Sequence, residues 1–437
     1  MLALLQRYPA FRRLWLADVV SLLGDWLTYV AVSVLALERG EGLVAVSLVL
    51  VAHALPSSLL APFAGWVVDR FERRRVMVVS SLLRSALALG MAAAAARGSL
   101  FWVQALLLIR IGLAAFSDPA VIASLPQVLH DPTDERSVDG QRGARLLQDL
   151  GTANRLIGAT WSALFAVGVA LGGFAAAFLG PTWAILLDAL TFLLAAWLAA
   201  GLPKLPPQPA RPAVGPSPAP AASLWTDLRE ALVYARSDNR ILEAALSKTP
   251  AAIINGGGWV LLNQRAQQLG ESSWLTTTAL ALGSLQCVRA LGTGVGPLLW
   301  HRFSPGDRSS AWWNATTWCA LLGVAALSMA PNTLFLSLAV LVWGVGVGAN
   351  WVAATTRLQR LAPDHLLGRL AALDLFGHTL GQCAGALGGA LVATQLADPR
   401  AAAWTGVALG ASAWLLLKLT GGYQKRPLTP LGERPIL

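Results

Sequence analysis

Twelve apolar runs of about 20 residues or more follow one another along this chain, and they constrain its fold more than any other feature. A helix needs about 20 mostly apolar residues to cross the roughly 30 Å of hydrocarbon in a bilayer. The runs cover residues 14–37, 44–68, 76–96, 99–118, 153–178, 181–200, 241–263, 274–299, 311–330, 333–356, 371–395 and 401–420. They predict an all-α membrane protein with twelve transmembrane helices, or with ten if the more polar seventh and eighth runs do not span.

The composition agrees with a membrane environment. Hydrophobic residues make up 55% of the chain and charged residues only 13%. Soluble globular domains carry about 25% charged residues, so this chain lies well outside their range. The lipid bilayer is therefore its first predicted partner.

Lysine and arginine residues are distributed unevenly between the loops. Of the 33 such residues, 24 lie in seven segments on one side of the predicted helices and four lie in loops on the other side. Because short cytoplasmic loops carry an excess of positive charge, this pattern predicts a multi-pass protein of the inner (cytoplasmic) cell membrane with both termini in the cytoplasm. Basic residues spread over seven loops form no single face, which argues against a nucleic-acid partner.

A proline-rich segment divides the chain into two parts. Residues 202–223 contain prolines throughout and cannot form a helix or the core of a sheet. Six predicted helices precede this segment and six follow it, which predicts two six-helix bundles over residues 1–201 and 241–421. Residues 202–240, whose last part is amphipathic, form the predicted cytoplasmic linker, and residues 422–437 form a cytoplasmic tail.

The segment after the second predicted helix carries a recognisable pattern. It contains Gly65, then Asp69 and Arg70, then Arg73 and Arg74. This spacing resembles the signature loop between helices 2 and 3 of the major facilitator superfamily, although Glu72 stands where that family usually has glycine. Other segments are similar to a branch of the superfamily that contains the enterobactin exporter and macrolide-efflux proteins, namely 11–15, 24–26, 118–120, 153–154, 187–192, 358–363 and 368–369.

The resemblance implies the major facilitator fold, in which the signature loop latches the two bundles together on the cytoplasmic side in the outward-facing state. The residues alone permit such a role, because Asp69 ends an apolar helix among arginines with which it can pair. The alternative is that these arginines only mark topology.

Two more elements enter through the same resemblance. Gly168, Gly172 and Gly173 in the fifth predicted helix are similar to the glycine-rich element of exporters, with Val169 in place of the usual proline. Arg110 resembles the helix 4 arginine of proton-coupled members, although the glycines that follow it are placed differently.

Ionisable residues inside the predicted helices are the candidates for a functional site. Each costs at least about 2.5–3.5 kcal/mol at the bilayer centre unless it faces a cavity or a partner. Asp25 and Asp188 are the deepest acids, and Arg84, Lys248 and Arg289 are the candidate cations. A carboxylate in such a place could load and release a proton or contact substrate. The alternative is a permanent ion pair that holds helices together.

Uncharged polar residues and acids near helix ends are weaker candidates. Asn255 precedes Gly256, Gly257 and Gly258, which predicts a bend or broken turn that lines the substrate pathway. His53 could titrate, but a lone membrane histidine is more often a packing residue. For the acids close to helix ends we expect capping or surface roles; these are Glu243 and Asp374.

Several classes of function find no support in the sequence. No P-loop, serine elbow or zinc-type spacing is present, so we expect no enzyme, no catalytic residues, no metal and no cofactor. The glycine repeats at 292–296 and 344–348 lie inside apolar helices, where they predict close helix packing and not nucleotide binding.

The leading prediction is a monomeric secondary active transporter, an antiporter that moves a small lipophilic or amphipathic molecule outward as protons move inward. Uptake or lysophospholipid movement by the same fold is the alternative. A non-transporting sensor or scaffold is a further alternative, but it would need a larger domain outside the membrane. Substrate identity does not follow from the fold.

Overall fold

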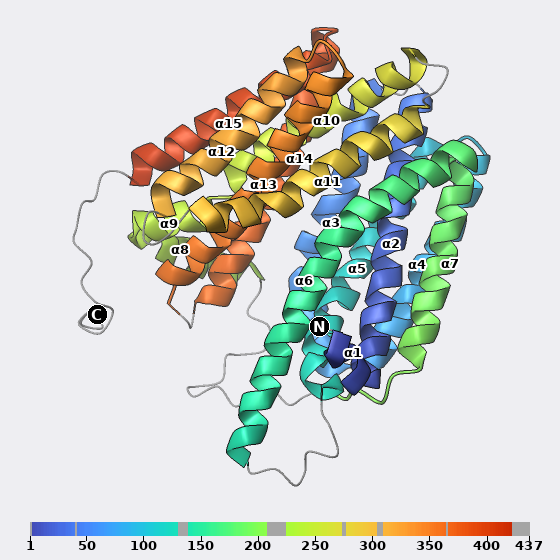
Figure 1. The fold of residues 1–437 in the computed structure, drawn as a ribbon, viewed down its shortest axis with the longest axis vertical. Coiled ribbons are helices and arrows are strands. Elements are labelled where there is room, and N and C mark those ends of the chain that lie inside the picture. Colours follow the sequence, from blue (N-terminus) through green and yellow to red (C-terminus); the bar gives the residue numbers. More distant parts are fainter. Residues whose placement is uncertain are drawn as a thin grey trace.

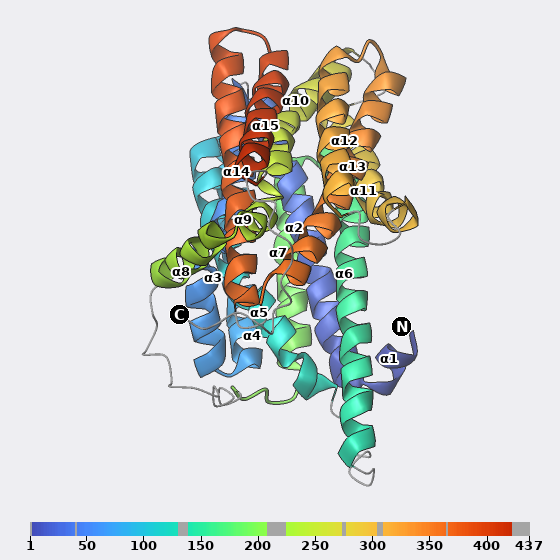
Figure 2. The same cartoon turned by 90° about the vertical axis from the view of Figure 1, so that its left-hand side faces the viewer.

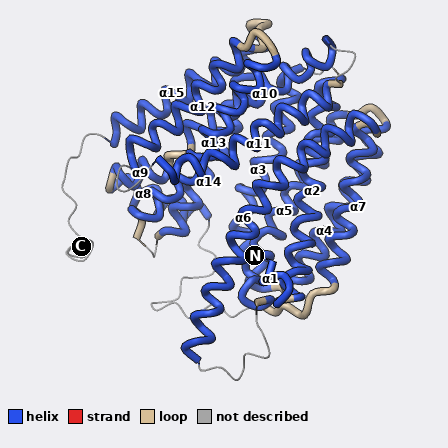
Figure 3. The backbone as a smooth tube through the Cα atoms, viewed as in Figure 1, coloured by secondary structure: helices blue, strands red, loops and turns tan. Residues whose placement is uncertain are grey.

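The computed structural model describes residues 2–39, 42–129, 139–207, 224–272, 277–303, 309–363 and 366–421, and within these ranges every regular element is a helix (Figure 3). The first seven helices are α1 (Leu2–Arg7), α2 (Pro9–Glu38), α3 (Gly42–Arg70), α4 (Arg73–Ala96), α5 (Leu100–Val128), α6 (Asp139–Phe178) and α7 (Pro181–Ala200). The remaining eight are α8 (Leu224–Ser237), α9 (Asn239–Ala245), α10 (Thr249–Ser272), α11 (Thr278–Phe303), α12 (Ser309–Met329), α13 (Thr333–Leu361), α14 (Leu367–Gln395) and α15 (Arg400–Gly421).

Twelve of these fifteen helices have 20 residues or more, which is long enough to cross a bilayer. In the described ranges, eight are also strongly apolar, whereas α10, α11, α12 and α14 are less apolar. Large apolar side chains cover the outside, and Phe101 and Trp197 are each 70% exposed. Lipid must cover such a surface, so the chain is an all-α multi-pass membrane protein, as predicted.

The predicted helices all overlap observed ones, but several boundaries are wrong. The fourth helix, α5, continues to Val128 instead of ending at 118, and the fifth, α6, starts at Asp139 instead of at 153. The seventh run differs most in its path. The chain forms the short helix α9 there, leaves the helical path near residues 246–248, and starts the long helix α10 at Thr249. The predicted start at residue 241 is therefore wrong. The amphipathic segment predicted over 224–236 forms α8, which packs against α9 and α14. The tail 422–437 and most of the proline-rich segment lie outside the described residues.

The long helices lie in two groups, α2–α7 and α10–α15 (Figure 1). We call the end of the molecule where α7 ends and α8 begins the linker end, and the opposite end the far end. The groups meet through α6 with α11 and through α3 with α14. They diverge toward the linker end (Figure 1), where α6 extends beyond the other helices (Figure 2).

Glycines bring the helix backbones together near the far end. A Cβ added to Gly168 would lie 2.7 Å from the Trp26 side chain, and a Cβ on Gly173 would lie 2.8 Å from Gly283 of α11. Gly172 also lies close to the backbone of α2. The predicted glycine element of α6 is therefore a packing face that holds α6 against both α2 and α11.

The prediction of a broken turn after Asn255 is wrong, because α10 continues through the three glycines. Each glycine instead faces a different neighbour at a distance where no side chain fits. Gly256 lies against the α14 backbone, Gly257 against the α15 backbone, and Gly258 against Val324 and Trp343. The run Gly256–Gly258 thus lets α10 pack into the centre of its group without interrupting the helix.

Candidate functional site

A buried network of four charged side chains joins the middles of α2, α4, α5 and α7. Arg84 lies 2.5 Å from Asp25, and Arg110 lies 3.2 Å from the other oxygen of Asp25. Arg110 also lies 2.5 Å from Asp188, which in addition accepts a hydrogen bond from Thr28. The network is balanced, with two carboxylates and two guanidinium groups, and its members come from positions up to 163 residues apart along the chain.

Aromatic and hydroxyl groups support these charges. The Phe192 ring lies 4.1 Å from the Arg84 guanidinium carbon and 5.3 Å from that of Arg110. Ser21 accepts a hydrogen bond from Arg84 at 3.1 Å. Cation–π contacts and hydroxyl partners lower the cost of holding arginine away from water. The four predicted residues Asp25, Asp188, Arg84 and Arg110 are thus brought together in one place.

Two further acids lie toward the linker end from this network. Asp18 on α2 and Asp118 on α5 both interact electrostatically with Arg84. Asp118 is exposed and Asp18 is partly exposed, whereas Asp188 is fully buried. Carboxylates therefore extend from an exposed position on α5 to the buried centre of the first group. Sequence analysis missed Asp18 as a site residue, although its spacing of seven from Asp25 places both on one helix face.

An aromatic cage surrounds Arg289 on α11, where the two groups of helices meet. The Arg289 guanidinium carbon lies 4.2 Å from the Trp259 ring, 4.9 Å from the Phe165 ring and 5.1 Å from the Trp343 ring. Its nitrogens donate to Gln286 at 2.9 Å and to Asn255 at 3.5 Å. The predicted candidates Asn255 and Arg289 therefore share a site.

Aromatic contacts connect this cage to the first group. Tyr29 of α2 meets Trp259 of α10 edge to face, with ring centroids 5.1 Å apart. Trp26 packs against Phe165 at 4.5 Å and against His53 at 5.4 Å. Because Tyr29 and Asp25 lie one turn apart on α2, the caged arginine and the charge network are neighbouring parts of one central region.

Lys248, the remaining predicted cation, belongs to a different place. It lies before α10 and pairs with Asp374 of α14 at 2.5 Å, with the Trp351 ring 4.1 Å away. Glu243 of α9 pairs with Arg357 at 2.5 Å and with Lys418. The expectation of capping or surface roles is therefore wrong for Asp374 and Glu243, because both are buried and form ion pairs with residues outside their own helices.

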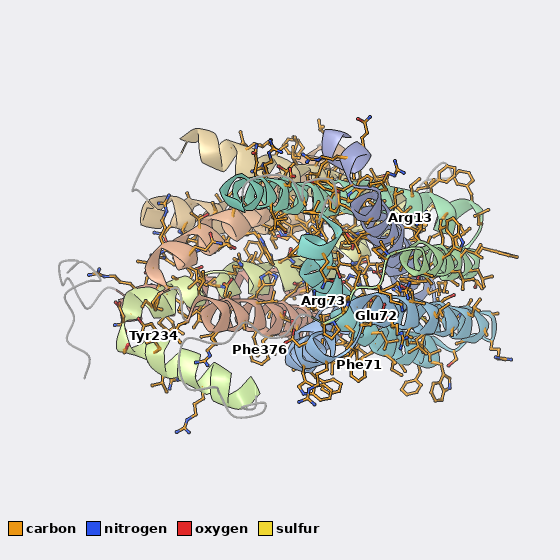
Figure 4. The ribbon with its side chains drawn as sticks, turned by 90° about the horizontal axis from the view of Figure 1, so that it is seen from below. Arg13, Phe71, Glu72, Arg73, Tyr234 and Phe376 are labelled. Carbon is orange, nitrogen blue, oxygen red and sulfur yellow. The ribbon has the colours of Figure 1, made fainter. Side chains whose placement is uncertain are left out.

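The signature-loop residues lie at the linker end of α3 and α4 (Figure 4). Arg73 donates to the carbonyl oxygen of Ala123 at 2.7 Å, while Glu72 pairs with Arg74 at 3.3 Å and with Arg75 at 2.8 Å. These contacts stay within the first group. The other three signature residues are less enclosed, since Asp69 and Arg70 are exposed and a Cβ on Gly65 would meet no atom within 4 Å.

The described side chains contain no group of three or more histidine, cysteine or acidic residues that could hold a metal ion. The site offers instead a buried charge network inside the first group and, beside it, a caged arginine where the two groups meet. Such an arrangement defines a membrane transporter and not an enzyme.

Comparison with known proteins identifies the family of this chain. The family model of the Major Facilitator Superfamily matches residues 14–386, and the chain belongs to this family. It is 32% identical over 161 residues to the multidrug efflux pump Tap of Mycolicibacterium fortuitum, a match that covers 36% of each protein. It is 22% identical over 190 residues to the uncharacterized transporter YvqJ of Bacillus subtilis, covering 43% of this chain and 41% of YvqJ. These matches thus span less than half of either relative's length.

Solved structures share the fold over nearly the whole chain. The nucleoside transporter NupG superposes with a TM-score of 0.67 at 11% identity, covering 94% of this chain and 100% of NupG. A POT family transporter in complex with 5-aminolevulinic acid superposes with a TM-score of 0.70 at 10% identity, covering 96% and 97% of the two chains. At such identities the likeness concerns the fold alone.

Proposed function

We propose that this protein is a proton-coupled antiporter that exports a small lipophilic or amphipathic compound by alternating access. It acts as a monomer in the inner membrane, with both termini and the linker end in the cytoplasm. The observation that carries the proposal is the balanced network of Asp25, Arg84, Arg110 and Asp188, because a network of this kind changes its net charge when one carboxylate takes up a proton.

The network supplies the coupling step. When either carboxylate is protonated, one arginine loses part of its electrostatic partner in a medium of low dielectric constant. Movement of that arginine toward another acceptor then lowers the free energy, and this movement shifts the packing of α2, α4, α5 and α7. Asp18 and Asp118 then provide the route by which the proton leaves toward the linker end.

The arrangement of the two groups supports alternating access. Contacts at Gly173 with Gly283 and at Tyr29 with Trp259 join them from the far end to the middle, while they diverge toward the linker end (Figure 1). With the linker end in the cytoplasm, this is the inward-facing form. Residues 1–201 and 241–421 then act as the two bundles that rock against each other.

The direction of transport rests on the partial similarity to Tap, whose name describes a multidrug efflux pump. The central region fits this class of substrate, because rings of Trp26, Phe165 and Trp259 present apolar faces beside the buried charges. Uptake by the same fold is the alternative that a transport assay decides.

The test uses purified protein in liposomes with an imposed pH gradient, with lipophilic cations, macrolides and siderophores as candidate substrates. We expect gradient-driven flux of at least one compound, and we expect Asp25→Asn and Asp188→Asn to abolish it. Exchange of labelled for unlabelled substrate without a gradient should persist in a variant that still folds and binds. If both variants keep full gradient-driven flux of a confirmed substrate, proton coupling through this network is refuted.

A further inference from the structure

Arg289 is a buried cation whose described surroundings are electrically neutral. Its side chain is in the middle of α11 and the residue is only 4% exposed. Its hydrogen-bond acceptors are the side-chain oxygens of Gln286 and Asn255, and three aromatic rings lie within 5.1 Å of its guanidinium carbon. A guanidinium at this depth is costly, and neutral partners repay only part of that cost.

Four other buried cations each pair with at least one carboxylate. Arg84 and Arg110 share Asp25 and Asp188, Lys248 has Asp374, and Arg357 has Glu243. Within the described ranges, no carboxylate lies within 4.0 Å of an Arg289 nitrogen. Arg73 is also buried, but it lies at the linker end, donates to the carbonyl oxygen of Ala123 and interacts electrostatically with Asp69. Arg289, in the centre of the molecule, therefore carries a positive charge that no nearby carboxylate of the described part of the chain balances.

Unpaired donors gather on the same neighbours. The indole nitrogens of Trp259 and Trp343 and the side-chain nitrogen of Gln286 are buried and have no hydrogen-bond partner. All three are donor groups on residues that contact Arg289. Buried polar atoms are normally satisfied, so several orphaned donors around one cation indicate an acceptor-rich ligand.

We propose that the Arg289 site recognises the anionic group of an amphipathic substrate, and that the transported compound is an organic anion with an aromatic or lipophilic body. The carboxylate or sulfonate accepts charge-assisted hydrogen bonds from Arg289, and the rings of Trp259 and Phe165 contact the apolar body. The inference rests on the proposed transport function and names its substrate class.

The experiment measures equilibrium binding to the purified full-length protein in detergent, without any gradient. Radiolabelled 2-naphthoate, 2-naphthamide and 2-naphthylmethylammonium share one ring system and differ in charge. We expect 2-naphthoate to bind at least about tenfold more tightly than the amide, since charge-assisted hydrogen bonds are worth that factor or more. The ammonium compound should bind most weakly.

Variants test whether Arg289 causes the preference for the anionic compound. Arg289→Gln should reduce the affinity for 2-naphthoate to that of the amide and leave the amide within about twofold, whereas Arg289→Lys should keep part of the preference. Arg97→Gln, at an exposed arginine of the far end, is the matched control and should behave as wild type.

The absence of a preference for the anion in the wild type, whether the three compounds bind equally or none binds, overturns the proposal. A preference that survives in Arg289→Gln overturns it as well. If Arg289→Gln does not fold, Arg289→Lys takes its place. A smaller preference for 2-naphthoate in Arg289→Lys than in the wild type supports the proposal, and an unchanged preference overturns it. Because binding is measured without a pH gradient, this result is independent of whether Asp25 and Asp188 couple transport to protons.

Discussion

Arg110 on α5 lies 2.5 Å from Asp188 on α7, and neither side chain has any exposed surface. Both charged groups are fully buried, so solvent screens their mutual attraction only weakly. Either charge would have a high desolvation free energy without its partner. This pair joins two helices that are otherwise connected through α4 and α2. A change in the charge of Asp188 should therefore alter the packing of α5 against α7 directly.

We expect Asp188→Asn to destabilise the protein strongly, by about 3 kcal/mol, because Arg110 then keeps only its longer contact with Asp25. The double variant Asp188→Asn with Arg110→Gln should be less destabilised than the sum of the single variants. Thermal unfolding in detergent measures all four proteins of this cycle. Additive effects would show that the two side chains do not interact as the structure places them.

The helices and the charged candidates were accessible from sequence, because apolar length and ionisable residues within it are local signals. The pairing of Asp25 with Arg84 and of Arg110 with Asp188 was not accessible, since it depends on which helices become neighbours. The break before Thr249 was missed because residues 241–248 are apolar enough to read as part of a span.

The cage of Arg289 was missed for a different reason. Tryptophans in membrane helices are commonly interface residues, and nothing local distinguishes Trp259 and Trp343 from those. The spacing of three between Gln286 and Arg289 was a usable signal, because it places both on one face of α11. The glycines after Asn255 were misread since glycine both weakens a helix and permits close packing, and tertiary contacts decide which effect prevails.

A second prediction concerns Gly65, which lies seven residues after Ser58 on α3 and so shares its helix face. Ser58 contacts Thr379 of α14 at 2.8 Å, and the two helices run in opposite directions. Closure of the linker end would therefore bring Ala372, now exposed, onto Gly65. We expect Gly65→Leu to fold normally but to abolish transport, because leucine would block this approach, and Gly65→Ala to have a smaller effect.

Crosslinking checks the same closure. With the three native cysteines replaced, the pair Gly65→Cys and Ala372→Cys should form a disulfide only in the fraction of molecules closed at the linker end. Asp69→Asn should reduce that fraction if the signature loop latches the closed form. A yield that does not respond to Asp69→Asn would remove the latch role, and full transport by a correctly folded Gly65→Leu would refute the expected approach of α14 to α3.

The last prediction concerns Glu243, which lies in α9 outside the spanning helices. Burial raises the pKa of this carboxyl, but the hydrogen bonds and charges of Arg357 and Lys418 outweigh burial and hold its pKa below the ordinary value of 4.5. A carboxyl with a lowered pKa contributes stability above its unfolded-state pKa and loses it as the pH falls through the folded-state pKa. The stabilisation should therefore be complete at pH 7 and decline only below about pH 4.5.

Melting temperatures in detergent between pH 7 and pH 4 measure this effect. Glu243→Gln should melt well below the wild type at pH 7, because the buried Arg357 and the partly exposed Lys418 lose their shared carboxylate, and the difference should narrow toward pH 4. Glu271→Gln, at an exposed carboxylate of the far end, is the control and should follow the wild-type curve at every pH. A constant offset between Glu243→Gln and wild type across the whole range would mean that Glu243 stabilises α9 by packing and not by its charge.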